Sequence, residues 1–400
     1  MEQRNYKKVE QNYPLLSTFL SKIQKLLYNK IPIYRDYSLK MLMLILLSIT
    51  IGSCYSIESD CRNIPIEPTP IPPTPPPLPR DGFWEIMPGS TSIHRIACDV
   101  NGNLLALLLG SSIHFYNGTS WQLISTGTAL TGINAIAVAP NGDAYVLGTV
   151  SFNRSTNGGI SWQHAFSPDT IKKNELAEIT ISPSGDIYFA TLNNVYVPNG
   201  SSWRKANTYG LSGTLSCPIA LSPNGGTLYA VEKVSSVRYY IIRSTDAGNS
   251  WLRSINYFSD TIRRLTIVDN NTIFVAAGYN GILKSTDGGQ HWNRCDTIIP
   301  GRVNCSHDII YNSRTGTLFA DIDGYAFNGC NVVISNDLGK SWRVQNGGLT
   351  DDPILHSYSF VFSPTTGDTY LKSSYSNNRF IMWENIIDFG DVYRYVPPIE

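Results

Sequence analysis

Tryptophan recurs at a nearly constant interval along most of this chain of 400 residues. The interval is about forty residues, which is the length of one structural repeat rather than of a whole domain. Trp383 falls outside the series, and Tyr393 occupies the position where the next tryptophan is expected. The tryptophans that set the interval are Trp84, Trp121, Trp162, Trp203, Trp251, Trp292 and Trp342.

A second marker precedes these aromatic residues by about twenty residues. It is a short turn, mostly rich in glycine and asparagine, that separates two runs of β-branched and aromatic residues. The runs INAIAVA and AYVLGT, on either side of APNGD, are one example. Such turns start at residues 99, 139, 182, 222, 268, 312 and 363, so both markers count seven units.

One unit read in full contains four strands. Between Trp251 and Trp292 the chain passes through LTIV, the turn DNN, TIFVAA, the loop GYN and GILKS, and the segment TDGGQHW leads to an outer strand. An antiparallel meander of this length is typical of a propeller blade. The sequence therefore predicts an all-β fold over residues 81–400, a seven-bladed β-propeller of four-stranded antiparallel blades. We expect FWEIM at 83–87 to pair with the last blade and close the ring.

The segment before the outer strand follows a pattern of its own, SxDxGxxW. It occurs as STDAGNSW at 244–251, STDGGQHW at 285–292 and SNDLGKSW at 335–342, with the amide variant STNGGISW at 155–162. These segments resemble the Asp-box, or BNR, repeats shared by sialidases, xyloglucanases, sortilin-type receptors and photosystem assembly propellers. The resemblance extends over residues 84–393.

We expect these turns to be structural rather than catalytic. The acidic or amide side chain can accept N–H groups of its own turn, glycine takes the positive φ, and tryptophan packs between sheets. A motif that recurs in most blades does not mark one site. The residues assigned to these turns are Asp246, Gly248, Trp251, Asp287, Gly289, Trp292, Asp337, Gly339, Trp342, Asn157 and Trp162.

The strands of each blade, named A to D from the axis outward, define two faces. The A–B and C–D turns lie on one face, and the B–C and D–A loops lie on the other. The fourth, sixth and seventh units are longest, with extra residues in KVSSVR, DGYAFNGC and KSSYSNN of the B–C loops. Variable loops on a rigid scaffold usually carry binding. The candidate binding residues on this face are Arg263, Arg302, His307, Asp308, Asp321, Asp323 and His356, with Asp260, Arg264 and Tyr279 expected beside them.

A catalytic site of the sialidase type is not predicted. Such a site uses three arginines, a tyrosine nucleophile and two acids, and the F/Y-R-I-P sequence that carries the first arginine is missing. Arg263 and Arg264 are adjacent in one strand, so only one can face a shared site. The xyloglucanases use a cleft between two propellers, whereas this chain has one. We expect no cofactor and no metal, because the six histidines follow no ligand spacing.

The cysteines suggest an oxidising compartment. Cys305 is expected in a D–A loop and Cys330 in a B–C loop of the same unit, so a disulfide between them is a hypothesis. Cys98 and Cys217 fall in inner strands, where they are expected to act as small apolar residues.

The first 53 residues predict an N-terminal extension and a signal peptide. Between Lys40 and Cys54 the run MLMLILLSITIGS carries no charge, and it is too short to span about 30 Å of bilayer but suits a signal-peptide core. Its end resembles the bacterial lipobox, which implies lipid attachment at Cys54. An ordinary secretory signal or a buried apolar strand is the alternative. Translation can start at Met1 or at Met41.

Residues 54–80 predict a stiff tether. The prolines between Pro65 and Pro79 exclude helix and sheet and favour polyproline II, so the segment holds the propeller away from the membrane. The formal net charge is zero, and no basic stripe indicates a nucleic-acid partner.

The sequence thus predicts a lipid-anchored, non-catalytic propeller in the bacterial cell envelope, facing the periplasm or the cell exterior. Its B–C/D–A face would bind a glycan, a peptide or a protein. The alternative is an exo-acting glycoside hydrolase of the sialidase type with a diverged site.

Overall fold

The structure, a computed structural model, describes most of the predicted propeller and nothing before it. The chain divides into two units, residues 1–75 and 76–400, and the predicted signal peptide, Cys54 and nearly all of the tether lie outside the described residues. No helix among the described residues is long and apolar enough to cross a membrane. The described residues are 82–398, with gaps at 91–92, 100, 109–111, 127–132, 149–150, 167–176, 297–302, 325–328, 350–354 and 376–390.

Seven four-stranded antiparallel sheets form the second unit, and they are the blades of a β-propeller. This confirms the predicted fold class. Blades 1 to 3 contain β2 (Ile93–Cys98), β3 (Leu104–Leu108), β4 (Ser112–Tyr116) and β5 (Trp121–Thr126); β6 (Ala135–Val138), β7 (Ala144–Leu147), β8 (Phe152–Ser155) and β9 (Gln163–Phe166); and β10 (Ala177–Ile181), β11 (Ile187–Thr191), β12 (Val195–Asn199) and β13 (Ser202–Lys205).

The remaining blades follow the same order. They contain β14 (Thr214–Leu221), β15 (Leu228–Ser235), β16 (Arg238–Ser244) and β17 (Leu252–Arg253) in blade 4; β18 (Arg264–Ile267), β19 (Ile273–Ala276), β20 (Ile282–Ser285) and β21 (Asn293–Arg294) in blade 5; β22 (Val303–Asn312), β23 (Thr317–Gly324), β24 (Gly329–Ser335) and β25 (Arg343–Val344) in blade 6; and β26 (Leu355–Phe362), β27 (Thr369–Tyr375), β28 (Val392–Val396) and β1 (Phe83–Ile86) in blade 7.

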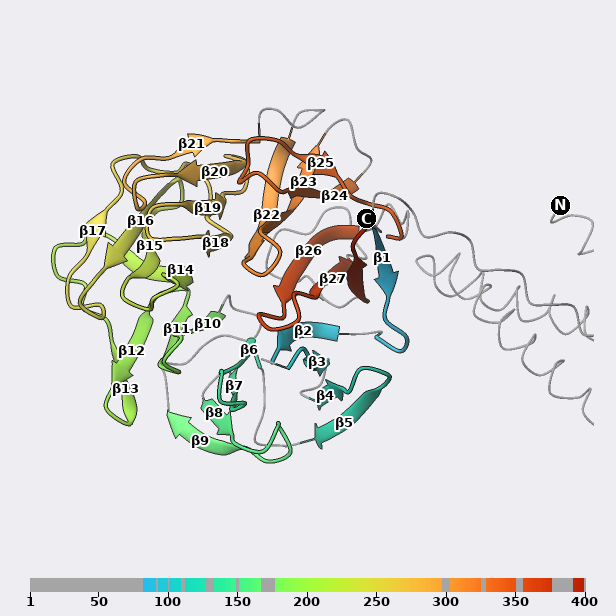
Figure 1. The fold of residues 1–400 in the computed structure, drawn as a ribbon. Coiled ribbons are helices and arrows are strands. Elements are labelled where there is room, and N and C mark those ends of the chain that lie inside the picture. Colours follow the sequence, from blue (N-terminus) through green and yellow to red (C-terminus); the bar gives the residue numbers. More distant parts are fainter. Residues whose placement is uncertain are drawn as a thin grey trace, which may run out of the picture. The chain divides into compact units, whose positions relative to one another are not determined.

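The innermost strands of the blades surround the axis. Each contacts the innermost strand of the next blade, and contacts between β26 and β2 complete the circle. The same ring of blades can be followed by colour, from blue β2 to red β26 (Figure 1). The innermost strands are β2, β6, β10, β14, β18, β22 and β26.

The ring closes through the first strand, as the sequence predicts. β1 pairs antiparallel with β28, from Phe83 opposite Val396 to Ile86 opposite Tyr393, and it is the outermost strand of blade 7. One detail of the prediction is wrong. Tyr393 is not the outer-strand aromatic of the last unit, because it lies in the third strand, and Trp84 in β1 fills that outer position.

Each interface between blades contains one tryptophan of the series. Seven apolar clusters are present among the described residues, each shared by two consecutive blades. Three of the indole nitrogens also donate to a main-chain oxygen of the preceding blade. These are Trp251 to Asn207 at 2.8 Å, Trp342 to Cys295 at 3.1 Å and Trp84 to Gln345 at 2.9 Å.

The extra residues of blades 4 and 6 form longer hairpins rather than the predicted loops. In blade 4 the pairing of β15 with β16 extends to Ser235 opposite Arg238, so KVSSVR is mostly strand. In blade 6 the ladder extends to Gly324 opposite Gly329. The innermost strands of these two blades, β14 and β22, are also long. They pair with the lengthened second strands, so the backbone groups near the face stay hydrogen-bonded.

Replacing Trp84 with alanine is expected to destabilise the protein by about 3–5 kcal/mol, the usual loss for a large buried aromatic side chain. Trp84 is 1% exposed and packs against Phe319, Phe360 and Tyr395 at the point of ring closure. Urea unfolding followed by tryptophan fluorescence measures the loss. The control is Ile86→Ala in the same strand, where the side chain is 49% exposed. Equal losses in the two variants would contradict the closing role of Trp84.

Candidate functional site

The carboxylates of the SxDxGxxW turns are bound within their own turns. Oδ1 of Asp287 accepts the hydroxyl of Ser285 at 2.9 Å and the main-chain N–H groups of Gln290 and His291, both at 3.0 Å. Asp246 and Asp337 make the corresponding bonds to the serines at each end of their turns. Each carboxylate therefore holds a bend.

These hydrogen bonds also keep the carboxylates ionised. Bonds from Ser250 and Ser341, through hydroxyl and main-chain groups, lower the pKa of Asp246 and Asp337 to about 2. The main-chain N–H of His291 is the largest influence that lowers the pKa of Asp287. A general acid needs a pKa near the working pH, so none of the three is suited to that role.

The amide variant keeps the same turn without a charge. Oδ1 of Asn157 accepts the N–H of Ser161 at 2.9 Å and the hydroxyl of Ser155 at 2.9 Å. Glycine is required after the acidic residue, because Gly289 has a φ of +88° and a Cβ at Gly339 would lie 2.9 Å from the Phe274 ring of the preceding blade. At Gly339 the turn thus packs closely against the preceding blade.

The candidate binding residues mostly lie in strands, not in loops. His307 and Asp308 belong to β22, Asp321 and Asp323 to β23, and His356 to β26. Arg263 immediately precedes β18, and its N–H donates to Ala276. Arg302 lies outside the described residues.

An ion-pair cluster lies among the innermost strands. Nη1 of Arg264 on β18 is 2.8 Å from Oε1 of Glu178 on β10, and its Nε is 3.6 Å from Oδ1 of Asp308 on β22. We call these three residues the axial cluster. The guanidinium joins blades 3, 5 and 6, and 36% of the Arg264 side chain is exposed.

The two carboxylates of the axial cluster also bind main-chain groups of the blades that follow them. Oε2 of Glu178 accepts the N–H of Ile219 in blade 4 at 2.9 Å, and Oδ2 of Asp308 accepts the N–H of Phe360 in blade 7 at 2.9 Å. Five of the seven blades are connected in this way. The carboxylates satisfy inner-strand N–H groups that have no neighbouring strand to bond.

Burial shifts the pKa values of the axial cluster. It raises the pKa of Glu178 and of Asp308, and the charge of Arg264 counteracts this shift in both. Burial also disfavours the charge of Arg264, but Glu178 and Asp308 raise its pKa. A further buried acid, Asp321, lies opposite Asp308 in the sheet, with Oδ2 3.4 Å from Nδ1 of His307.

A positional signal in the sequence marks the axial cluster. Each of its residues is the fourth before the residue that opens the A–B turn, at Ser182, Val268 and Asn312. Arg95 holds the same position before Asp99 in blade 1. Aligning the units on their A–B turns, rather than inspecting each loop, would have identified these equivalent charged positions.

The chemistry of the axial cluster favours a structural role. Its charges contact one another or main-chain donors, and no group of three potential metal ligands is present in the described part of the chain. The cluster therefore resembles a cross-blade brace.

The register argues against the predicted disulfide. Asp323 lies directly opposite Cys305 on one side and Cys330 on the other, so the two cysteines are two strand spacings apart, about 9–10 Å. A disulfide requires Cα atoms closer than about 7 Å. Cys305 is a free, buried thiol on β22. Cys98 and Cys217 lie in the innermost strands, as predicted.

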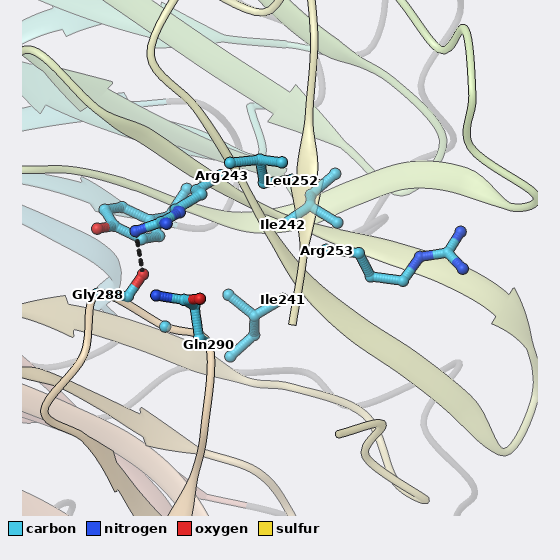
Figure 2. Close-up of a pocket in the computed structure, with 9 residues that line it drawn as sticks. Ile241, Ile242, Arg243, Leu252, Arg253, Gly288 and Gln290 are labelled. Atoms are coloured by element: carbon cyan, nitrogen blue, oxygen red, sulfur yellow. Dashed lines mark hydrogen bonds between the residues drawn. The ribbon is translucent and has the colours of Figure 1, made fainter. Parts of the chain in front are cut away.

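A small cavity lies between blades 4 and 5. Figure 2 shows Arg243 extending toward Gly288, whose oxygen accepts a bond from Nη1 at 3.0 Å, while Arg253 points away. The cavity holds about 90 Å³, well below the ~300 Å³ of a small-ligand site. It is a gap in the packing between blades.

A larger groove, of about 440 Å³, lies on the B–C/D–A face. The D–A segment that enters blade 5 forms one wall and the B–C loop of that blade forms the other. Its volume is in the roughly 300–1,000 Å³ range of small-molecule sites. We call it the tyrosine groove; it is lined by Asn256, Tyr257, Phe258, Ser259, Tyr279, Asn280, Leu283, Trp292 and Arg294.

The groove lies on the face that the sequence predicts for binding, but the candidate binding residues do not line it. Of the residues expected on this face, only Tyr279 lines the groove, and Asp260 accepts its main-chain N–H. The segment INYFSD, which supplies Tyr257, is an aromatic-rich D–A connection outside the repeat pattern. Exposed aromatic residues in non-repeating loops would have been a better guide than charged residues.

Comparison with known proteins supports the fold. No protein-family model matches the sequence, and no curated protein matches it. Similar solved structures include a GH74 xyloglucanase from Xanthomonas campestris, at 14% identity over 77% of this chain and 56% of that one, with a TM-score of 0.56. Another is a catalytically inactive virginiamycin B lyase from Staphylococcus aureus with quinupristin, at 12% identity over 78% and 97% of the chains, with a TM-score of 0.56.

A third similar structure is the GH74 enzyme of Niastella koreensis, with 16% identity over 72% of this chain and 52% of that chain, and a TM-score of 0.50. The match thus spans about half the length of the GH74 enzymes. At these identities the likeness shows a propeller fold and does not assign an activity.

Replacing Arg264 with alanine should cost about 2–3 kcal/mol at neutral pH, because the buried Asp308 and the half-buried Glu178 lose their counter-charge; the loss is below the ~3–5 kcal/mol of a fully buried pair because Arg264 is partly exposed. Burial holds their folded-state pKa values above the unfolded ones, so the cost of ionising them appears as pH rises through the folded-state values. The loss should therefore be smaller near pH 5 than near pH 8, as measured by urea unfolding.

The matched control is Arg394→Ala, which removes an exposed arginine paired with Glu85 at 3.0 Å. Exposed pairs contribute about 0–1 kcal/mol, so this variant should remain near wild type at both pH values. An Arg264→Ala loss that is equally small, or independent of pH, would contradict the bracing role.

Proposed function

We propose that this chain is a non-catalytic binding propeller, anchored by lipid to the outside of a bacterial membrane. Its ligand is a glycan, a peptide or a protein, held on the B–C/D–A face. The tyrosine groove carries this proposal. It combines a ligand-sized volume with two largely exposed tyrosines, Tyr257 at 54% and Tyr279 at 72% exposure.

The use of charge elsewhere supports binding over catalysis. The three SxDxGxxW carboxylates are engaged in their turns, and the axial cluster is engaged between blades. The turn geometry also supports our assignment of the repeats to the Asp-box class. Exposed aromatic side chains with few rotatable bonds are the residues that binding surfaces favour.

The alternative function is an exo-acting glycoside hydrolase of the sialidase type. It would have to use the axial cluster, where Arg264 is partly exposed beside two carboxylates. The fold alone does not decide between the two functions, because one fold supports many activities.

The test uses the full-length chain, purified in mild detergent. It is incubated with fluorogenic sialosides and applied to glycan and peptide arrays. We expect binding to an array and no hydrolysis of the sialosides. Binding is measured by fluorescence on the arrays, and hydrolysis by release of the fluorophore. The hydrolase would be supported instead if the wild type releases the fluorophore and the Arg264→Lys variant does not, while circular dichroism shows that the variant is folded. No binding to either array would contradict the proposed function.

The proposed anchor has a separate test. Changing Cys54 to alanine should abolish incorporation of an alkyne-labelled fatty acid and release the protein from the membrane fraction, because stable anchoring needs acyl chains. Cys61→Ala, a few residues further along, is the matched control and should retain the label. Labelling that persists in Cys54→Ala would show that the lipid is attached elsewhere.

A further inference from the structure

The two walls of the tyrosine groove are fastened to each other. Oδ2 of Asp260 in the D–A segment accepts the N–H of Tyr279 in the B–C loop at 2.8 Å. Oδ1 of Asn280 accepts the N–H of Ser259 at 3.1 Å, and its Nδ2 donates to the hydroxyl of Ser259 at 2.9 Å. The two backbone segments that carry Tyr257 and Tyr279 are thereby held in place relative to each other.

Glycine makes this contact between the walls feasible. Gly278 has a φ of +52°, and a Cβ there would collide with Oδ2 of Asp260. The carboxylate can reach the Tyr279 N–H only because this side chain is missing. A groove that is already ordered loses little conformational entropy when a ligand binds.

The aromatic rings of the groove are presented differently from those of the core. Tyr257 contacts the ring of Tyr240, with centroids 6.3 Å apart, and the guanidinium of Arg238 lies 5.1 Å from its ring centre. It remains largely exposed despite these contacts. Trp292 also lines the groove, and its indole N–H donates to the main-chain oxygen of Gly289 at 3.1 Å.

The lining of the groove offers hydrogen-bonding groups but no unpaired charge, and the guanidinium of the adjacent Arg238 lies against the Tyr257 ring. Arg294 is the one ionic side chain in its lining, and it is paired with the fully buried Asp296. In the described part of the chain, no hydrogen-bond partner is present for the hydroxyls of Tyr257 and Tyr279 or for the side-chain amide of Asn256. A ligand that fits has apolar faces for the rings, polar edges for these groups, and no net charge.

A pyranose ring has this combination. Its axial C–H groups are weakly positive and complement the negative face of an aromatic ring, and its equatorial hydroxyls can bond to amide and phenol groups. We infer that the tyrosine groove binds a neutral oligosaccharide, with Tyr257 and Tyr279 as stacking platforms and Asn256 as a hydrogen-bonding residue. This inference rests on the proposed binding function and names its ligand class and its site.

The test uses isothermal titration of the full-length chain in mild detergent with cellohexaose, xyloglucan heptasaccharide, mannohexaose and lacto-N-neotetraose, and with sialyllactose as the acidic probe. At least one neutral sugar should bind more tightly than sialyllactose. Tyr257→Ala and Tyr279→Ala should each weaken that binding about tenfold, as expected for loss of an aromatic contact and its hydroxyl. Tyr279→Phe should weaken it less, because the ring remains.

The matched control is Tyr209→Ala, in the D–A connection between blades 3 and 4 and therefore on the same face but outside the groove. Tyr209 is 88% exposed, so this variant should bind as the wild type does. Circular dichroism and urea unfolding check that all four variants are folded, and both groove tyrosines are exposed enough to be removed without a loss of core packing.

The outcomes separate the inference from the proposed function. Neutral-sugar binding that is unchanged in both alanine variants overturns the groove as the site and leaves a binding propeller. Preference for sialyllactose overturns the neutral ligand class. If the chain binds peptides on the array, loses this binding when the two tyrosines are replaced, and binds no sugar, the groove is a peptide site and the inference is overturned. If none of the sugars binds and neither array shows binding, the proposed binding function is contradicted as well.

Discussion

The structure depends on how the hydrogen-bonding groups at the strand edges are satisfied in a ring of sheets. An edge strand exposes unpaired N–H and C=O groups, which is costly inside a fold and hazardous outside it. At the rim, the outer strands β17, β21 and β25 have only two residues each. At the axis, side chains of one blade bond the inner edge of another, as Glu178 does for Ile219, Asp308 for Phe360 and Thr266 for Tyr311. The pairing of β1 with β28 removes the remaining break in the ring.

This use of side chains limits where function can reside. The acids on the axis are placed where a catalytic site of a propeller is often sought, but they bond main-chain groups across blades and share Arg264 as their counter-charge. Any change there alters the closure of the ring as well as the local charge. A ligand site is under less constraint on a loop wall, where Tyr257 and Tyr279 project from backbone held by Asp260 and Asn280. Stability and recognition are therefore carried by different residues of the same blade.

Much of the fold could be predicted from the sequence, because repetition averages out the ambiguity of any single strand. Seven turns and seven tryptophans were sufficient to define the blades, their strand order and the closing role of FWEIM. Features that occur once were harder. Tyr393 was misplaced because the last blade takes its outer strand from the other end of the chain. The loops of blades 4 and 6 were longer strands because hairpin length depends on pairing, which periodicity does not reveal. The ion pair between Glu178 and Arg264 joins residues from different blades, so only a three-dimensional register connects them.

The repeat and the candidate site are also related by contrast. STDGGQHW supplies blade 5 with the bend at Asp287, the glycine at 289 and, in Trp292, one residue of the groove lining, and the equivalent residues of blades 4 and 6 supply the same bend. What distinguishes blade 5 is the pair of connections INYFSD and GYN, which share no pattern with the other units. A repeated motif must satisfy the same packing in every blade, so it cannot discriminate one ligand from another. Selectivity has to arise where the repetition stops, and here that position is occupied by two exposed tyrosines that line the groove together with a repeated tryptophan.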